Sequence, residues 1–147
     1  MTFLLDSNVV SELRRVRTGR ADPNVVAWAE AQVPSSLFLS AIVVFELELG
    51  VRQKERTDPV QGRVLRLWLD GQVLPAFEGR VLPVDTAIAV RAAPFHVPDP
   101  APMRDSLIAA AAAHHSLTVA TRNIDDFART GVPLVNPWTV GLAEDSR

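Results

Sequence analysis

The stretch Thr2-Phe3-Leu4-Leu5-Asp6 decides the fold of this chain, because it joins a short apolar run to an abrupt acidic stop. A run of this length predicts a buried strand, which is typical of a parallel sheet. In open parallel sheets, ligands bind beyond the carboxyl ends of the strands. The sequence therefore predicts that Asp6 lies at the sheet edge where a functional site would form.

Short apolar runs and helical patterns alternate along the rest of the chain. This alternation predicts an α/β domain with a central parallel sheet. Residues 94–102 contain four prolines and are predicted to form a loop. The other predicted strands are residues 37–39, 81–83, 118–120 and 134–135. The predicted helices are residues 9–15, 23–32, 41–54, 59–70, 103–115 and 124–127, with one more that opens at Asp85 or Thr86 and runs to 93.

Length and composition narrow the class of protein. The 147 residues are 48% hydrophobic and 22% charged, and no linker or repeat interrupts them, so we expect one globular domain over residues 1–147. The chain has no cysteine, which excludes disulfides and thiolate metal sites. A net charge of −2 argues against a general nucleic-acid coat protein, but it allows a nuclease with local positive charge. No signal peptide or membrane span is recognisable, so we expect a cytoplasmic protein with no membrane partner.

Glu46 is the most informative acidic residue, because of its place in the predicted helix 41–54. Steps of about 100° per residue put it in the middle of an apolar arc that faces the protein body. A carboxylate there must be neutralised, paired or bound to a metal, so a buried Glu–Arg pair and a metal site both stay open. Glu48 lies on the opposite side, where we expect a surface ion pair with Arg52. The arc consists of Ile42, Val43, Phe45, Leu47, Leu49 and Gly50.

Three other polar residues stand where a helix begins, and each has an ordinary structural explanation. Asp6 can cap the helix that follows it. Asp105, in the first turn of helix 103–115, has the charge that a helix N-terminus favours. Asn123 follows the predicted strand 118–120 and can cap the turn 124–127.

Asp6, Glu46 and Asp105 indicate a functional site more strongly together than singly, because all three can converge at one end of the sheet. Clustered carboxylates repel one another, and one of them would be protonated unless a cation joins them. Their hard oxygen atoms suit Mg²⁺, or Mn²⁺ in its place. We therefore predict a divalent-metal site formed by these three side chains.

The histidines offer no competing mechanism. His114 and His115 end a predicted helix, and His96 lies in the proline-rich loop, so all three are expected at the surface. A group of arginines close to Asp6 is either a solvated face or a patch that attracts phosphates. This group comprises Arg14, Arg15, Arg17 and Arg20.

Four strings of this sequence resemble the motifs of PIN-domain toxins, in the same order along the chain. Leu4-Leu5-Asp6-Ser7-Asn8-Val9-Val10-Ser11-Glu12 resembles the first motif, and Phe45-Glu46-Leu47-Glu48-Leu49-Gly50 resembles the second. Asp105-Ser106-Leu107-Ile108-Ala109-Ala110 is similar to the third, and Thr121-Arg122-Asn123 to the fourth. The ending Val135-Asn136-Pro137-Trp138 resembles the VapC/FitB branch of the family.

This resemblance implies a Rossmann-like α/β/α fold of three layers and a magnesium-dependent endoribonuclease. It also implies a toxin of a type II toxin–antitoxin system, a homodimer that cuts RNA and is held by a VapB-type antitoxin. By resemblance, Asp6, Glu46 and Asp105 are the metal ligands, and Asn123 completes the catalytic set. Ser7 and Thr121 would supply supporting hydroxyls.

The fourth motif departs from the common pattern, since many relatives have aspartate where this chain has Asn123. An amide oxygen can ligate a hard metal or orient a water, but it brings no charge. We interpret the asparagine as variation rather than as loss of activity.

Three other functions can be weighed against a ribonuclease. A receiver domain needs a lysine at a late strand end, and Lys54, the single lysine, is in the wrong place. A haloacid-type phosphotransferase needs a second aspartate where Asn8 stands. A non-catalytic PIN-like module that binds RNA or a protein stays open. Cleavage of RNA in the presence of metal would distinguish it from an enzyme.

Overall fold

The strand β1 (Phe3–Leu5) is the centre of a five-stranded parallel sheet in the computed structural model, which describes residues 1–140. Leu4 lies opposite Phe38 on one neighbouring strand and Val119 on the other, and all three residues of β1 are buried. The strands confirm the predicted parallel sheet, whose order is β3-β2-β1-β4-β5. The other strands are β2 (Leu37–Ser40), β3 (Val81–Leu82), β4 (Thr118–Ala120) and β5 (Leu134–Val135).

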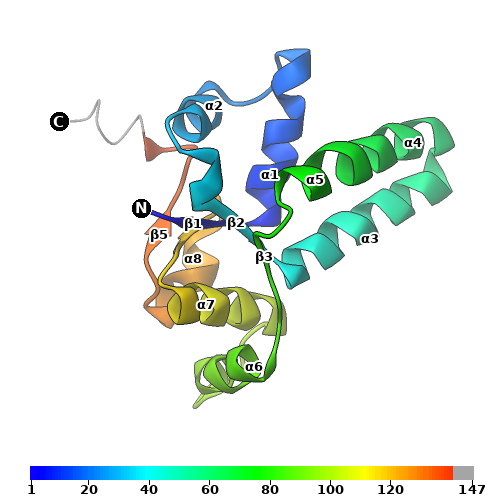
Figure 1. Cartoon of the computed structure of the whole chain (residues 1–147). Coiled ribbons are helices and arrows are strands. Elements are labelled where there is room, and N and C mark those ends of the chain that lie inside the picture. The colour runs from blue at the N-terminus through cyan, green and yellow to red at the C-terminus, as the bar shows by residue number, and fades with distance from the viewer. Residues whose placement is uncertain (141–147) are drawn as a thin grey trace.

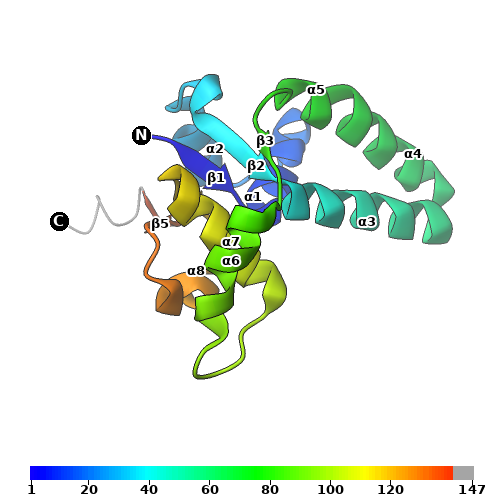
Figure 2. The ribbon, with the colours of Figure 1, turned by 60° about the horizontal axis from the view of Figure 1, so that its bottom comes forward.

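Helices cover both faces of this sheet and complete the expected three-layer α/β/α fold (Figure 1). One face carries α1 (Ser7–Arg14), α2 (Pro23–Glu30) and α5 (Leu74–Ala76). The opposite face carries α6 (Thr86–Ala92), α7 (Met103–His115) and α8 (Ile124–Phe127). The long helices α3 (Ala41–Thr57) and α4 (Pro59–Trp68) form a hairpin that extends beyond the sheet, as Figure 2 shows from a second direction.

Local capping explains why most helices begin where the sequence predicts. The Asp6 carboxylate accepts a hydrogen bond from Ser7 N at 2.7 Å and caps α1. Ser40 Oγ accepts from Ile42 N at 3.2 Å at the start of α3. Pro23 and Pro59 stand at the first turns of α2 and α4, where a missing N–H costs no hydrogen bond.

Two segments differ from the prediction. The helix expected over 59–70 leaves α-helical geometry after Trp68 and passes into a π-helical turn, Leu69–Val73. Pro75 explains the change, since it has no N–H and its ring would collide with the carbonyl four residues earlier. The proline-rich loop begins with a 3₁₀ turn, Ala93–His96, and His96 Nε2 lies 2.8 Å from Ser106 Oγ. His96 is therefore half-buried, and its expected place at the surface was wrong.

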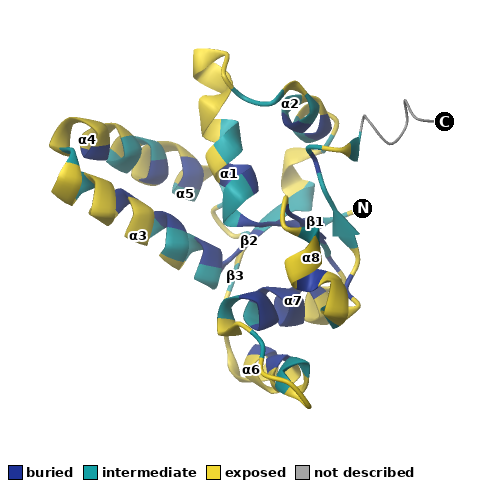
Figure 3. Cartoon of the chain, turned by 180° about the vertical axis from the view of Figure 1, so that it is seen from behind, coloured by how far each residue is buried: buried dark blue, intermediate teal, exposed yellow. Residues whose placement is uncertain are grey.

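The broad apolar arc predicted for α3 was also wrong. Val43, Leu47 and Val51 are buried, but Phe45 is 60% and Leu49 44% exposed. The reason is that α3 extends past the sheet, so only one narrow stripe of it is covered (Figure 3). By contrast, α7 is buried along much of its length through small residues, of which Ala109 to Ala112 are at most 1% exposed.

Arg66 holds the α3–α4 hairpin together. Its guanidinium donates to Glu48 at 2.7 Å and to Glu55 at 3.0 Å on α3. These hydrogen bonds lower the pKa of both carboxyl groups below their ordinary value. The expected pair between Glu48 and Arg52 is present at 3.6 Å, so Glu48 has two cationic partners. In the part of the chain that the structure describes, no helix is long and apolar enough to cross a membrane.

Candidate functional site

Asp6 stands at the carboxyl end of the central strand and is fully buried. While one of its oxygens caps α1, Oδ2 accepts from Thr121 Oγ1 at 2.7 Å, at the end of β4. Asn8 Nδ2 lies 3.5 Å from the same Oδ2 and 3.4 Å from Thr121 Oγ1. The ends of two neighbouring strands therefore fix Asp6, and it is both a helix cap and a site residue.

Arg104, in the first turn of α7, joins the three predicted acids. Its Nε donates to Glu46 Oε2 at 2.5 Å and its Nη1 to Asp105 Oδ1 at 2.8 Å, while Nη2 donates to Asp6 Oδ1. The same Nη2 lies 3.3 Å from Ser7 Oγ. The structure thus brings Asp6, Glu46 and Asp105 together, each on a different nitrogen of one guanidinium.

We call the cluster of Asp6, Glu46 and Asp105 around Arg104 the acidic pocket. Its charges do not balance, since one cation faces three carboxylates. Burial lowers the pKa of the Arg104 guanidinium, but its hydrogen bond to Glu46 and the charge of Asp6 outweigh burial and raise that pKa above the ordinary value. Arg104 is thus firmly cationic. Of the two possibilities that the sequence left open for Glu46, the structure shows the pair with an arginine, and the role as a metal ligand stays a prediction.

The donor atoms of the pocket fit a hard divalent cation, but their present arrangement is built around Arg104. Glu46 Oε1 is buried and accepts no hydrogen bond from residues 1–140, so it is free to bind a ligand. The other donors are carboxylate and hydroxyl oxygens, which Mg²⁺ and Mn²⁺ prefer. Within the described residues, however, no three acidic or histidine side chains are grouped closely enough to hold an ion.

Asn123 is connected to the pocket through its backbone. Its N–H donates to Thr121 Oγ1 at 3.0 Å, which in turn donates to Asp6. The Asn123 side chain is exposed and makes no capping hydrogen bond to α8. Its expected place in the catalytic set stays a prediction.

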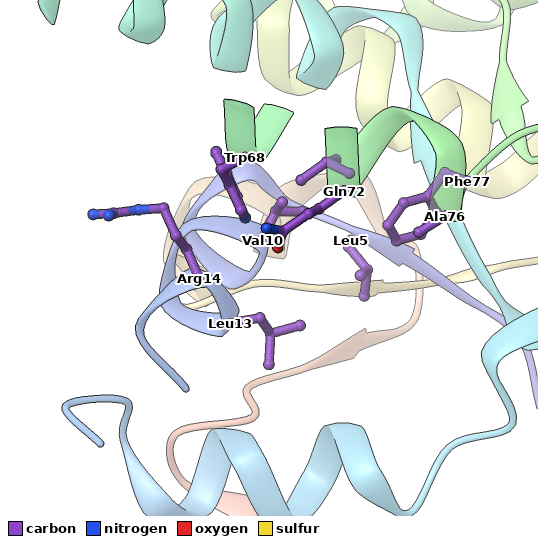
Figure 4. A pocket seen from close by; sticks show the side chains of 9 residues that line it. Leu5, Val10, Leu13, Arg14, Trp68, Gln72, Ala76 and Phe77 are labelled. Carbon is purple, nitrogen blue, oxygen red and sulfur yellow. The ribbon is translucent and has the colours of Figure 1, made fainter. Parts of the chain in front are cut away.

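A groove between α1 and α4 leads away from the acidic pocket. Next to Ser7 and Glu46 it is lined by Gly50, Leu65 and Trp68. A second, apolar hollow, which shares Arg14 and Trp68 with the first, lies between Leu5, Val10 and Leu13 on one side and Trp68 and Phe77 on the other (Figure 4). We call these two adjoining hollows together the α1–α4 groove. Arg14, one of the clustered arginines, lies over the Trp68 ring at 5.9 Å, and Arg14, Arg15, Arg17 and Arg20 are all exposed.

The chain belongs to the PIN-domain family, whose model matches residues 3–133. Within that family it is similar to toxins of the VapC and FitB type. It is 38% identical to VapC ribonuclease Y4jK of Sinorhizobium fredii, over 92% of this chain and 97% of that protein. It is 40% identical to toxin FitB of Neisseria gonorrhoeae, over 92% of this chain and 98% of that one.

Solved structures give the same assignment. The crystal structure of FitAcB from Neisseria gonorrhoeae superimposes with a TM-score of 0.85 at 37% identity, covering 95% of this chain and all of that one. A structure of FitAB bound to an IR36 DNA fragment superimposes with a TM-score of 0.81 at 35% identity, covering 93% of this chain and 96% of that one.

The sequence prediction missed Arg104 and the contacts of Asn8. One signal for Arg104 is present in the sequence, because a cation in the first turn of a helix opposes the helix dipole. An arginine placed there, directly before a predicted metal ligand, indicates a nearby cluster of acids. Asn8 has no comparable signal beyond its position two residues after Asp6.

Proposed function

We propose that this chain is a metal-dependent endoribonuclease, the toxin of a type II toxin–antitoxin system, with Mg²⁺ as its ion and Mn²⁺ as a substitute. One observation carries the proposal: Asp6, Glu46 and Asp105 converge at the carboxyl end of β1. Supporting it, relatives that align over nearly the whole chain are named as a ribonuclease and a toxin.

The proposed mechanism assigns Asp6, Glu46 and Asp105 as metal ligands. A bound divalent ion would lower the pKa of a water for attack on phosphorus and stabilise the leaving oxygen. Thr121 and Asn8 fix the Oδ2 oxygen of Asp6, so this ligand is oriented before substrate binds. Asn123 follows on the same strand end, and we assign it to orienting water. The exposed arginines near α1 would attract the RNA backbone.

The direct test is cleavage of a labelled RNA by the purified protein. We expect fragments with Mg²⁺ or Mn²⁺ and no fragments with excess EDTA, since three acids cannot activate a water without the ion. Sequencing of the RNA ends after induced expression would identify the target. Cleavage that EDTA leaves undiminished, or no cleavage of any cellular RNA with metal present, would contradict the proposal.

A non-catalytic PIN-like module remains the second candidate, and one observation favours it. Arg104 fills the acidic pocket in the way a permanent structural ion pair would. Such a module would bind RNA or a protein without producing fragments, so the cleavage assay separates the two functions.

We further propose that a VapB-type antitoxin binds the α1–α4 groove and places a basic side chain in the acidic pocket. The pocket already binds a guanidinium, whose flat fork matches clustered carboxylates. One hollow of the groove reaches Glu46 and the other is apolar, and the apolar one suits a bound helix or strand. Two of the matched structures contain Fit proteins named as an AB pair, which supports a partner of this kind.

We expect a short reading frame next to this gene to encode the antitoxin, and its product should co-purify with the chain and suppress cleavage. Trp68→Ala should weaken this complex at least tenfold in a titration, because Trp68 lines both parts of the groove. His115→Ala changes an exposed residue of α7, on the face of the sheet opposite to α1, and it should leave the affinity unchanged. Failure of the two proteins to associate, or unaltered cleavage in their complex, would disprove this partner.

The homodimer expected from the family resemblance would appear in light scattering as twice the mass of one chain.

A further inference from the structure

Arg104 stands where a cation is electrostatically favoured by its neighbours and disfavoured by its own helix. The N-terminus of α7 carries the positive end of the helix dipole, which repels a guanidinium in the first turn. Three carboxylates offset this repulsion, and each meets a separate nitrogen of the side chain. The contact is therefore specific to the acidic pocket.

The atoms that Arg104 binds are the atoms a metal ion would need. Asp6 Oδ1, Glu46 Oε2 and Asp105 Oδ1 each accept from the guanidinium. A divalent ion at the same oxygens would face a positive charge a few ångströms away, which repels it strongly in a partly buried site. Arg104 and the ion thus exclude one another.

We propose that Arg104 is an internal cation that closes the acidic pocket of the metal-free protein, so that a divalent ion binds only when the guanidinium leaves. This inference rests on the proposed metal site and adds a competitor to it. It also explains why the acids, though all in one pocket, are not grouped for an ion within the described residues.

The structure lets Arg104 leave without unfolding. Its side chain is 30% exposed, and its long stem can rotate toward solvent. Asp6 keeps its position, because Thr121 and Asn8 hold the oxygen that Arg104 does not touch. Glu46 Oε1 is already free of partners among residues 1–140. The acidic pocket therefore has a second state, in which its carboxylate oxygens bind the ion in place of the Arg104 guanidinium.

Calorimetric titration of MnCl₂ into the full-length protein tests this competition. Arg104→Met keeps the length of the side chain and removes its charge, so we expect Mn²⁺ to bind at least tenfold more tightly than to the wild type. Arg104→Lys should give an intermediate affinity, because one ammonium cannot reach three carboxylates. Arg66→Met is the matched control, since Arg66 also bridges several acids but lies outside the pocket, and its affinity for Mn²⁺ should equal that of the wild type.

Thermal unfolding provides a second readout that needs no enzymatic activity. In EDTA, Arg104→Met should unfold at a lower temperature than the wild type, because its three acids face one another without a cation. Saturating Mn²⁺ should raise its Tm by more than that of the wild type. Equal or weaker Mn²⁺ affinity in a folded Arg104→Met protein would overturn the competition while leaving the metal site in place. No Mn²⁺ binding to either protein would overturn both.

Discussion

Asp6→Asn should reduce the rate of RNA cleavage by about 100-fold or more and abolish growth inhibition, while the protein stays folded. Removal of one electrostatic contact to a reacting centre has an effect of this size. Asp6 is fully buried at the end of the central strand, and Thr121 at the end of the neighbouring strand β4 holds one of its oxygens in place. An amide in its place brings no charge to a metal ion.

The fold should survive this change because the amide oxygen can still accept from Ser7 N and cap α1. The amide nitrogen would face the donors that now meet Oδ2, which costs on the order of 1 kcal/mol in a buried network. Initial cleavage rates at saturating Mg²⁺, with equal amounts of protein confirmed by circular dichroism, give the measurement.

Asp22→Asn is the matched control for Asp6→Asn. Asp22 is also an aspartate that caps a helix, and it accepts from Asn24 N at 2.9 Å at the start of α2. It makes no contact with the acidic pocket, so the same chemical change there should leave cleavage unaltered. An Asp6→Asn protein with more than a tenth of the wild-type rate would rule out Asp6 as an essential ligand. Equal losses in the two variants would point to helix capping instead.

Much of the fold could be predicted because its signals are local. Four of the five described strands end at or directly before a polar residue. Several helices start at side chains or prolines whose capping role is visible in the sequence, such as Asp6, Ser40 and Pro59. The π-helical turn before Pro75 was missed, since the sequence does not reveal how a helix relieves a missing N–H. The exposed face of α3 was missed because periodicity shows which residues share a face but not how far the sheet extends beneath it.

The candidate site also has one part that the sequence predicts and one part that it does not. Asp6, Glu46 and Asp105 could be predicted to converge because parallel strands bring their carboxyl ends to one edge. The cation between them could not, since its position depends on the rotamer of Arg104 and on contacts across 58 and 98 residues of chain. Asn123 shows the opposite difference. Its motif predicts a side chain in the site, but in the structure only its backbone is connected to the acidic pocket.

Gly62→Ala should destabilise the protein by about 2 kcal/mol, although alanine is the better helix former. Gly62 lies where α4 crosses α3, and an added Cβ would stand 2.7 Å from Glu55 N and 2.8 Å from Glu55 Cγ. The backbone of α3 cannot move aside as a flexible side chain would, so the two helices must separate. Overpacking of this kind costs about 3 kcal/mol at the upper end of its usual range, and the helix propensity of alanine returns about 1 kcal/mol.

Separation of the helices would also stretch the hydrogen bonds from Arg66 to Glu48 and Glu55 and move Trp68 relative to α1. Gly62→Ala should therefore weaken antitoxin binding as well as folding. For stability alone, Gly50→Ala is the matched control, since Gly50 lies within α3 and an added Cβ there meets nothing within 4 Å. It is no control for antitoxin binding, because Gly50 lines the α1–α4 groove. It should stabilise the protein by about 1 kcal/mol. Urea unfolding of the three proteins measures both shifts, and midpoints that rise together would show that α3 and α4 are not in close contact at Gly62.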